Sequence, residues 1–261
     1  MRSESQRGVF PIAAGVVAPR SPGGRPASWA ATGRSGGVSA PPYDSLNLAG
    51  HVGDAPEAVA ENLARVGALL RPGTPVAVMD AVHGADVAEV GAPGLVPSVD
   101  GLVTDVPGLA LVALGADCVP MALVGDDDRT VAVVHCGWRG LVADVVGAVL
   151  DVLDRRGCGV QQAVLGPSVC GSCYPVPPQR AAQVVDLCGT TVSAAALVRC
   201  PDGQPGIDVA GGVVARLMER GVAVDAVHRA GGCTVEDPTL FSHRRDGVTG
   251  RQGVVIARMG S

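Results

Sequence analysis

The chain has 261 residues, of which 47% are hydrophobic and 17% are charged, with a mean hydropathy of +0.32. Such an apolar composition excludes an intrinsically disordered chain, and the length suits one large core or two small ones. The net charge is −5, from 20 basic residues that are all arginine and 25 acidic residues, which argues against a general nucleic-acid-binding surface.

The N-terminal region, residues 1–27, is rich in Arg, Ser, Pro and Gly and predicts a mobile extension. Its apolar stretch Val9–Ala18 is similar to a weak signal peptide, but Pro11 and Gly15 interrupt it. No run of 18 apolar residues occurs, so we expect neither a transmembrane helix nor a membrane partner. Eight cysteines, several of them in apolar strand-like runs, do not form a disulfide scaffold and favour a reduced, cytoplasmic protein.

Three segments carry the pattern of an amphipathic helix. The first starts at Asp54-Ala-Pro-Glu57, which resembles a capping box, and continues with apolar residues at helical spacing to Leu70. The second covers Gly140–Gly157. The third covers Val209–Arg220 and ends at Gly221, which suits a helix C-cap.

Short runs of Val and Leu, bounded by Gly, Pro and Asp, predict six buried strands. They are Val76–Met79, Gly101–Thr104, Leu109–Leu114, Thr130–His135, Ala163–Leu165 and Val254–Ala257. Because these strands alternate with the helices, we predict an α/β fold in a single domain over residues 28–261.

Three residues that bind metals well stand at the ends of predicted strands. His83 follows the first strand in a Val-His-Gly-Ala-Asp segment, Cys118 follows the third, and His135 ends the fourth and leads into a helix. Binding sites in α/β folds lie at such strand ends. Two imidazoles and one thiolate suit a tetrahedral Zn²⁺ with an open fourth position, which activates a water or polarises a substrate oxygen.

Other roles for the cysteines are also open. Cys118 fits a small buried apolar residue, or a nucleophile with His135 as its base, but the second role leaves His83 unused. Cys170 and Cys173 form a CxxC motif, which is typical of a redox pair or half a zinc site. We do not expect a redox role, because no helix pattern begins at the first cysteine and no second CxxC occurs.

Arginines near the predicted helices are candidates for anion binding. Arg139 precedes the helix at Gly140, and a helix N-terminus with a guanidinium is a ready phosphate site. Arg244 and Arg245 form a pair near the C-terminus, for which simple solvent exposure is the alternative.

Four separated blocks, taken together, are specific to one family. The chain resembles the laccase-domain family, also called the YfiH-like or multicopper polyphenol oxidase family, over about residues 28–259. The blocks are Gly36–Tyr43 with Ser45–Leu48 and His51–Asp54; Val82–Asp86; Asp100–Thr104 running to Ala116–Pro120; and Val134–Gly140. Shorter matches follow at Gly166-Pro167, Cys173-Tyr174, Cys233-Thr234, Arg244–Gly247 and Gly250-Arg251.

This resemblance implies a single α/β domain of layered β-sheets flanked by helices. It also implies a zinc-dependent purine nucleoside phosphorylase that acts on adenosine, inosine, guanosine and methylthioadenosine and that deaminates adenosine. The family's metal ligands fall on His83, Cys118 and His135, which would then be the catalytic residues. We expect Asn47, in the Ser-Leu-Asn-Leu block, to hydrogen-bond the substrate, and Arg139 and Arg245 to bind phosphate.

The family's names leave other roles open. The older oxidase label implies copper, but one three-ligand site cannot hold the several coppers of a laccase. Members are also described as peptidoglycan-editing factors, so hydrolysis of a cell-wall precursor is an alternative. A third possibility is a zinc-binding regulator without catalysis. Four departures from the family pattern leave the ligands intact but affect their surroundings: Ala81 for Gln, Gly115 for Thr, His243 for Tyr, and Val235-Glu236 for Tyr-Cys.

Overall fold

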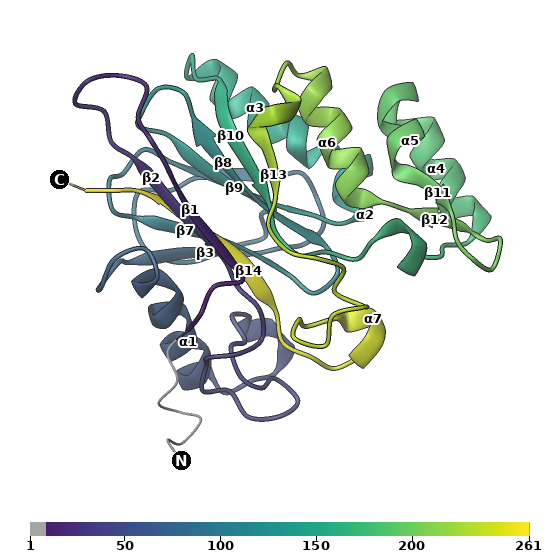
Figure 1. The fold of residues 1–261 in the computed structure, drawn as a ribbon, viewed down its shortest axis with the longest axis horizontal. Coiled ribbons are helices and arrows are strands. Elements are labelled where there is room, and N and C mark those ends of the chain that lie inside the picture. The colour runs from purple at the N-terminus through teal and green to yellow at the C-terminus, as the bar shows by residue number, and fades with distance from the viewer. Residues whose placement is uncertain (1–8, 261) are drawn as a thin grey trace.

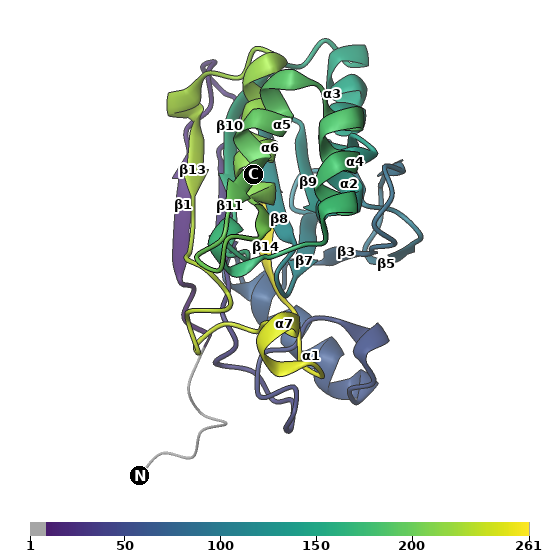
Figure 2. The same ribbon diagram turned by 90° about the vertical axis from the view of Figure 1, so that its right-hand side faces the viewer.

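Two six-stranded β-sheets stack face to face in the computed structural model, which describes residues 9–260 (Figures 1 and 2). In the order of pairing, the first sheet contains β1 (Ala13–Val17), β2 (Ala27–Ala31), β14 (Gln252–Arg258), β7 (Ala110–Gly115), β3 (Val76–Asp80) and β5 (Gly94–Pro97). The second contains β13 (Val227–Arg229), β10 (Val160–Leu165), β8 (Val119–Gly125), β9 (Val131–Cys136), β6 (Gly101–Thr104) and β4 (Val87–Glu89). The layered α/β fold that the sequence predicts is therefore confirmed.

Helices pack against the outer faces of the two sheets, one helix on the first sheet and a larger group on the second (Figure 1). Against the first sheet packs α1 (Pro56–Ala68). Over the second lie α2 (Trp138–Val142), α3 (Val145–Arg155), α4 (Pro178–Cys188), α5 (Thr190–Ala196) and α6 (Val209–Glu219). The α4–α5 region also carries the hairpin of β11 (Leu197–Arg199) and β12 (Pro205–Ile207).

The apolar side chains form three layers of core. One layer lies between the two sheets, a second lies between the first sheet and α1, and a third lies between the second sheet and its helices. Strands β7, β8, β9 and β14 are buried on both faces, which explains their continuous Val, Leu and Ala runs. The polar loops at the strand ends are consequently the places where chemistry can occur.

Two predicted helices differ from the structure, one by a break within its range and one at its N-terminal cap. The helix expected over residues 140–157 is two helices, because Asp144 adopts a left-handed φ of 60° and its side chain accepts a hydrogen bond from the backbone N–H of Gly147. The predicted capping box at Asp54 is wrong: Ala55 is the N-cap of α1, and the Asp54 carboxylate instead accepts from Ser39 Oγ at 2.6 Å and Asn47 Nδ2 at 2.9 Å.

The N-terminal extension is described from residue 9 onward, and residues 1–8 lie outside the described range. Within residues 9–27, Ala13–Val17 forms the edge strand β1, which pairs antiparallel with β2. A fully mobile extension is thus the wrong description of this segment, because the backbone of β1 is hydrogen-bonded into the first sheet.

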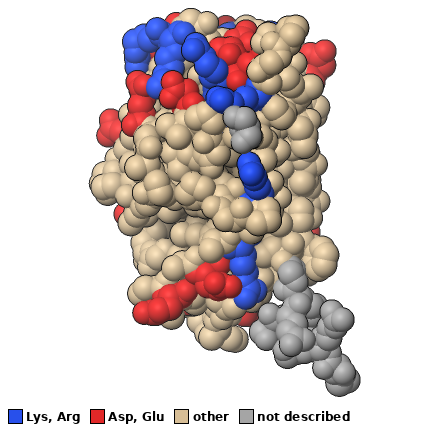
Figure 3. All heavy atoms as spheres, turned by 90° about the vertical axis from the view of Figure 1, so that its left-hand side faces the viewer, with Lys and Arg blue, Asp and Glu red and all other residues tan. Residues whose placement is uncertain are grey.

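The surface shows no basic stripe on the face drawn in Figure 3, as far as the described residues are concerned. Arginines and acidic side chains lie beside one another at both ends of this face, and its middle carries few charges. Over residues 9–260, no helix combines the length and the apolar character that crossing a membrane requires.

Three shorter helical turns lie in the connections between the longer elements. One is the 3-10 turn η2 (Gly50–Val52), and another is α7 (His243–Asp246), which lies before β14. A third, η3 (Gly171–Cys173), follows β10.

Candidate functional site

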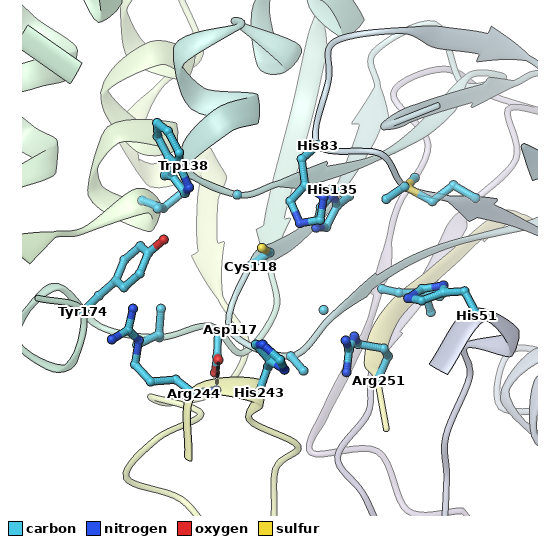
Figure 4. Close-up of a pocket in the computed structure, with 18 residues that line it drawn as sticks. His51, His83, Asp117, Cys118, His135, Trp138, Tyr174, His243, Arg244 and Arg251 are labelled. Atoms are coloured by element: carbon cyan, nitrogen blue, oxygen red, sulfur yellow. Dashed lines mark hydrogen bonds between the residues drawn. The ribbon is translucent and has the colours of Figure 1, made fainter. Parts of the chain in front are cut away.

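A pocket of about 610 Å³ opens at one end of the two sheets (Figure 4). This volume lies within the range of small-molecule sites. Its walls come from distant parts of the chain, including η2, the loop after β3, the loop between β7 and β8, the end of β9 and α7. The labelled residues that line it are His51, His83, Asp117, Cys118, His135, Trp138, Tyr174, His243, Arg244 and Arg251.

The three predicted metal ligands meet in this pocket. One coordinating atom from each of His83, Cys118 and His135 lies within 4.8 Å of the other two. The imidazole rings stand edge to face with centroids 4.7 Å apart. His135 is buried, Cys118 is partly buried and His83 is exposed, so the group has a closed side and an open side. The structure therefore brings together the residues that the sequence pattern singles out.

A tight turn directs His83 toward the other two ligands. His83 has a φ of 64°, in the left-handed region that side chains other than glycine rarely adopt. The carboxylate of Asp100 stabilises the turn, since it accepts hydrogen bonds from the backbone N–H groups of His83 at 2.9 Å and Gly84 at 2.7 Å.

Asp100 also orients His135. Its Oδ1 lies 2.8 Å from His135 Nδ1, and its side chain is fully buried. With Nδ1 engaged in this way, Nε2 is the nitrogen of His135 that remains for a ligand. Asp100 is not among the residues that the sequence predicts for the site. It stands at the start of a matched sequence block, but an aspartate before a strand has no pattern that reveals this role.

The charges in the group favour a thiolate beside an imidazolium when no metal is bound. Burial disfavours the Cys118 thiolate, but the charge of His135 and hydrogen bonds from both histidines outweigh it and lower the pKa of Cys118 to about 6. Burial likewise disfavours charged His135, yet the Cys118 thiolate and Asp100 raise the pKa of His135 to about 9. The thiolate is the form of cysteine that coordinates metals.

Gly137 leaves room for this group. A Cβ atom at position 137 would lie 2.8 Å from Cys118 Sγ and 3.2 Å from His83 Cδ2. A side chain there would therefore displace at least one of the ligands.

One wall of the pocket is basic. It contains His243, Arg244 and Arg251 (Figure 4). The Arg251 guanidinium donates to the carbonyls of Thr249 and Gly250, and burial lowers its pKa. The guanidinium of Arg244 lies 4.5 Å from the centroid of the Tyr174 ring. This wall suits an anion.

A second wall is aromatic and apolar, with Trp138, Tyr174, Val169 and Val209. Tyr174 and Trp138 lie on the same side of the pocket in Figure 4. Aromatic and aliphatic surfaces of this kind suit a flat heterocycle. The pocket thus combines an anion-binding wall, an apolar wall and a group of metal-binding side chains.

Three predicted substrate residues lie elsewhere. Asn47 is fully buried and outside the pocket lining, and its Oδ1 accepts from the backbone N–H of Arg251 at 2.9 Å, so it positions Arg251. Arg139 is exposed and lies over the Trp138 ring, 5.6 Å from its centroid. The guanidinium of Arg245 donates to backbone carbonyls of residues 234, 237 and 240 and pairs with Asp246. Neither Arg139 nor Arg245 lines the pocket, so their expected role in phosphate binding stays a prediction.

The departures from the family pattern divide into two groups. Ala81, Gly115 and His243 line the pocket, so they face whatever binds there. Val235 does not line it; its carbonyl lies 3.5 Å from Arg245 Nη1.

Known proteins resemble this chain over most of its length. The family model described as multi-copper polyphenol oxidoreductase laccase matches residues 28–259. A Mycobacterium tuberculosis protein named purine nucleoside phosphorylase is 44% identical over 227 residues, covering 84% of this chain and 87% of that protein. A Streptomyces griseus protein of the same name is 42% identical over 232 residues, covering 86% and 92%. The crystal structure of YlmD from Geobacillus stearothermophilus superposes with a TM-score of 0.82 at 30% identity, covering 90% of this chain and 92% of that one.

Proposed function

Because this chain belongs to the multi-copper polyphenol oxidoreductase laccase family, we propose that it is a purine nucleoside phosphorylase that holds zinc on His83, Cys118 and His135. Relatives that are 42–44% identical carry the name purine nucleoside phosphorylase. The observation that carries the proposal is the convergence of the three ligand atoms within 4.8 Å in a pocket with a basic and an aromatic wall.

The donor set fits zinc. Two imidazoles and a thiolate are typical zinc ligands, and three protein ligands leave one position for a substrate. The hydrogen bond between Asp100 and His135 is the support that such histidines usually have. When bound, the ion acts as a Lewis acid that polarises a substrate oxygen. A laccase reaction with several coppers does not fit this group of three ligands.

The remaining residues bind and orient the two substrates. In phosphorolysis a phosphate oxygen forms a bond to C1′ of the ribose and the bond between C1′ and the purine breaks. The purine takes up the proton that the phosphate gives up, so the products are the free base and a ribose 1-phosphate. Arg244 and Arg251 bind the phosphate, and Tyr174 and Trp138 pack against the purine. Burial, together with the charge of Arg251, lowers the pKa of His51, so this imidazole is neutral at pH 7 and accepts a hydrogen bond from a substrate hydroxyl.

The test is the release of hypoxanthine from inosine with and without phosphate, using untagged protein loaded with zinc. We expect release that depends on phosphate and that Cys118→Ala abolishes together with zinc retention at this site. Cys158→Ala, which removes a buried thiol outside the pocket, is the control and keeps the activity. Full activity in Cys118→Ala contradicts the proposed site.

A parallel assay with amino-acyl muramyl nucleotides, together with the zinc content, separates the two alternative functions. A hydrolase that edits cell-wall precursors would cleave amino-acyl muramyl nucleotides and would not require phosphate. A regulator would bind zinc without turning over any nucleoside. Either result replaces the phosphorylase proposal.

Adenosine deamination stays a prediction of the family resemblance. Zinc-dependent base deaminases use a carboxylate outside the metal's ligands to move protons. Asp117 has the one carboxylate among the described residues that line the pocket. It accepts hydrogen bonds from Thr234 Oγ1, Ser242 Oγ and the backbone N–H of Arg244, each at 2.7 Å. Because these hydrogen bonds already engage the Asp117 carboxylate, we propose phosphorolysis as the main activity. Ammonia release from adenosine is measured in parallel.

A cytoplasmic location is also part of this proposal. All eight cysteines are free thiols, as a reducing compartment would keep them.

A further inference from the structure

Next to the pocket, four other side chains that bind metals converge. Cys170, Cys173, Cys233 and Glu236 each offer one ligand atom, and these atoms all lie within 4.8 Å of one another. None of the four lines the pocket. We propose that they form a second, structural zinc site, which we call the Cys3Glu site. This inference does not depend on the proposed function.

Backbone pairing brings the CxxC motif and the distant Cys233 together. Cys170 and Cys173 are the N-cap and the last residue of η3. Cys233, which lies 63 residues from Cys170 in the chain, forms an isolated parallel bridge with Ser168, and its Sγ accepts from the backbone N–H of Cys170 at 3.4 Å. The CxxC motif, which has no partner motif in the sequence, therefore has a third thiol beside it in the fold.

Glu236 completes a set of four. Its Oε1 lies 3.4 Å from Cys173 Sγ and 4.0 Å from Cys170 Sγ. Zinc binds sulfur at about 2.3 Å in a tetrahedron, which places neighbouring sulfurs about 3.8 Å apart. Separations of 4.8 Å or less reach this geometry with small side-chain movements. Four protein ligands leave no open position, which is the arrangement of a structural zinc site.

A redox role explains these residues less well. A reactive CxxC pair needs a thiolate that a helix N-terminus or a basic group stabilises, whereas this motif lies in a 3-10 turn of three residues beside a carboxylate. Three thiols and a carboxylate held together repel one another as they ionise unless a cation lies among them. A bound zinc ion accounts for all four residues, and a disulfide accounts for two.

The Cys3Glu site lies directly behind the wall of the pocket. Tyr174, which follows Cys173, lines the pocket. Thr234, which follows Cys233, donates from Oγ1 to Asp117 at 2.7 Å, and Asp117 precedes Cys118. Zinc at this site therefore ties the loop after β10 to the segment before α7 and keeps Tyr174 and Asp117 in place.

The test is the zinc content of untagged full-length protein, dialysed and measured by plasma mass spectrometry. We expect about two zinc ions per chain in the wild type and about one in each of Cys118→Ala and Cys233→Ser. X-ray absorption at the zinc edge of Cys118→Ala should give three sulfurs at about 2.3 Å and one oxygen. Cys200→Ala is the matched control, because the Cys200 thiol lies near η3, 3.5 Å from the Gly171 carbonyl, but outside the group of four.

Different results overturn the proposal. One is a Cys118→Ala protein that is folded by circular dichroism but holds no zinc. Another is a disulfide among the three cysteines in the purified protein. A third is a Cys233→Ser protein that keeps the zinc content of the wild type. If Cys233→Ser does not fold, Glu236→Gln takes its place: we expect it to keep three thiolate ligands and to lose zinc to a chelator at least tenfold faster than the wild type does. An unchanged rate of loss also overturns the proposal. Inosine turnover is measured separately, so a failure of the proposed function leaves these results readable.

Discussion

Asp100 and His135 form a buried pair in which Oδ1 of the carboxylate lies 2.8 Å from Nδ1 of the imidazole. The same carboxylate accepts from the backbone N–H groups of His83 and Gly84. The hydrogen bonds from His135 and from the backbone lower the pKa of Asp100 against the opposing effect of burial, so it stays ionised at neutral pH. One aspartate thus holds two of the three proposed ligands in place.

Replacing this aspartate should weaken metal binding without removing a ligand. For Asp100→Asn we expect a loss of zinc affinity of about 10- to 100-fold, the usual effect of removing a carboxylate that supports a ligating histidine. Titration against a chelator measures it, with Asp105→Asn as the control, since Asp105 is exposed and pairs with Arg156. An affinity equal to that of the wild type would show that Asp100 does not act through His135.

Metal affinity should rise with pH over a defined range. Cys118 loses its proton at a pKa of about 6, and His135 keeps its proton up to a pKa of about 9. Between these values the free group has one proton to lose before zinc binds, so the apparent affinity should rise about tenfold per pH unit and level off above pH 9. Below pH 6 the thiol must also be deprotonated, so the affinity falls more steeply. Calorimetry in buffers of different ionisation enthalpy should detect release of about one proton at pH 7.5. Uptake of a proton, or no exchange, contradicts the assignment.

Gly137→Ala tests the space around the ligands. Its new Cβ would lie 2.8 Å from Cys118 Sγ, and overpacking of this kind costs about 1–3 kcal/mol. The backbone of Gly137 has a φ of −89°, which alanine adopts without strain, so the fold should survive. We expect zinc affinity and inosine turnover to fall at least about tenfold while circular dichroism is unchanged. Gly91→Ala, where a Cβ meets nothing within 4 Å, serves as the control.

The convergence of the three proposed ligands could be predicted from the sequence because each lies at the end of an apolar run. The residue that supports these ligands, and the contact that assembles the Cys3Glu site, could not be predicted in this way. Asp100 acts through hydrogen bonds to residues 16–35 positions away, and Cys233 reaches Cys170 only through a bridge between loops. Local pattern does not encode such contacts.

The same limit applies to the secondary structure. Val76–Met79, Gly101–Thr104 and Val254–Ala257 were predicted nearly to their ends, since they are buried on both sides. Strand β8 is not among the predicted strands because Pro120 breaks its pattern. The strand begins at Val119, so this proline lies near an end of the strand, where proline is tolerated. The break between α2 and α3 was missed because apolar spacing continues through it, while the left-handed Asp144 ends the hydrogen-bonding pattern.

Arg244 should bind phosphate. Its guanidinium lines the pocket and packs against Tyr174. For Arg244→Ala we expect the KM for phosphate to rise at least about tenfold, the cost of one charge-assisted contact. The KM for inosine should change less. Arg139→Ala is the matched control, because Arg139 is exposed outside the pocket. An unchanged KM for phosphate would remove Arg244 from the phosphate site.

Arg245 should matter for stability instead. Its guanidinium donates at 2.7 Å to the Thr234 carbonyl, 2.9 Å to the Asp237 carbonyl and 2.7 Å to the Leu240 carbonyl. Hydrogen bonds to a charged group contribute about 1.5–3 kcal/mol, so Arg245→Ala should lower the free energy of unfolding by about 2–3 kcal/mol. Urea titration of the zinc-loaded protein measures this loss. Because the same segment carries Thr234 and Cys233, the variant should also release zinc from the Cys3Glu site more readily than Arg244→Ala does. If Arg245→Ala instead raises the KM for phosphate at unchanged stability, its guanidinium contacts the substrate and does not hold the segment 234–240 in place.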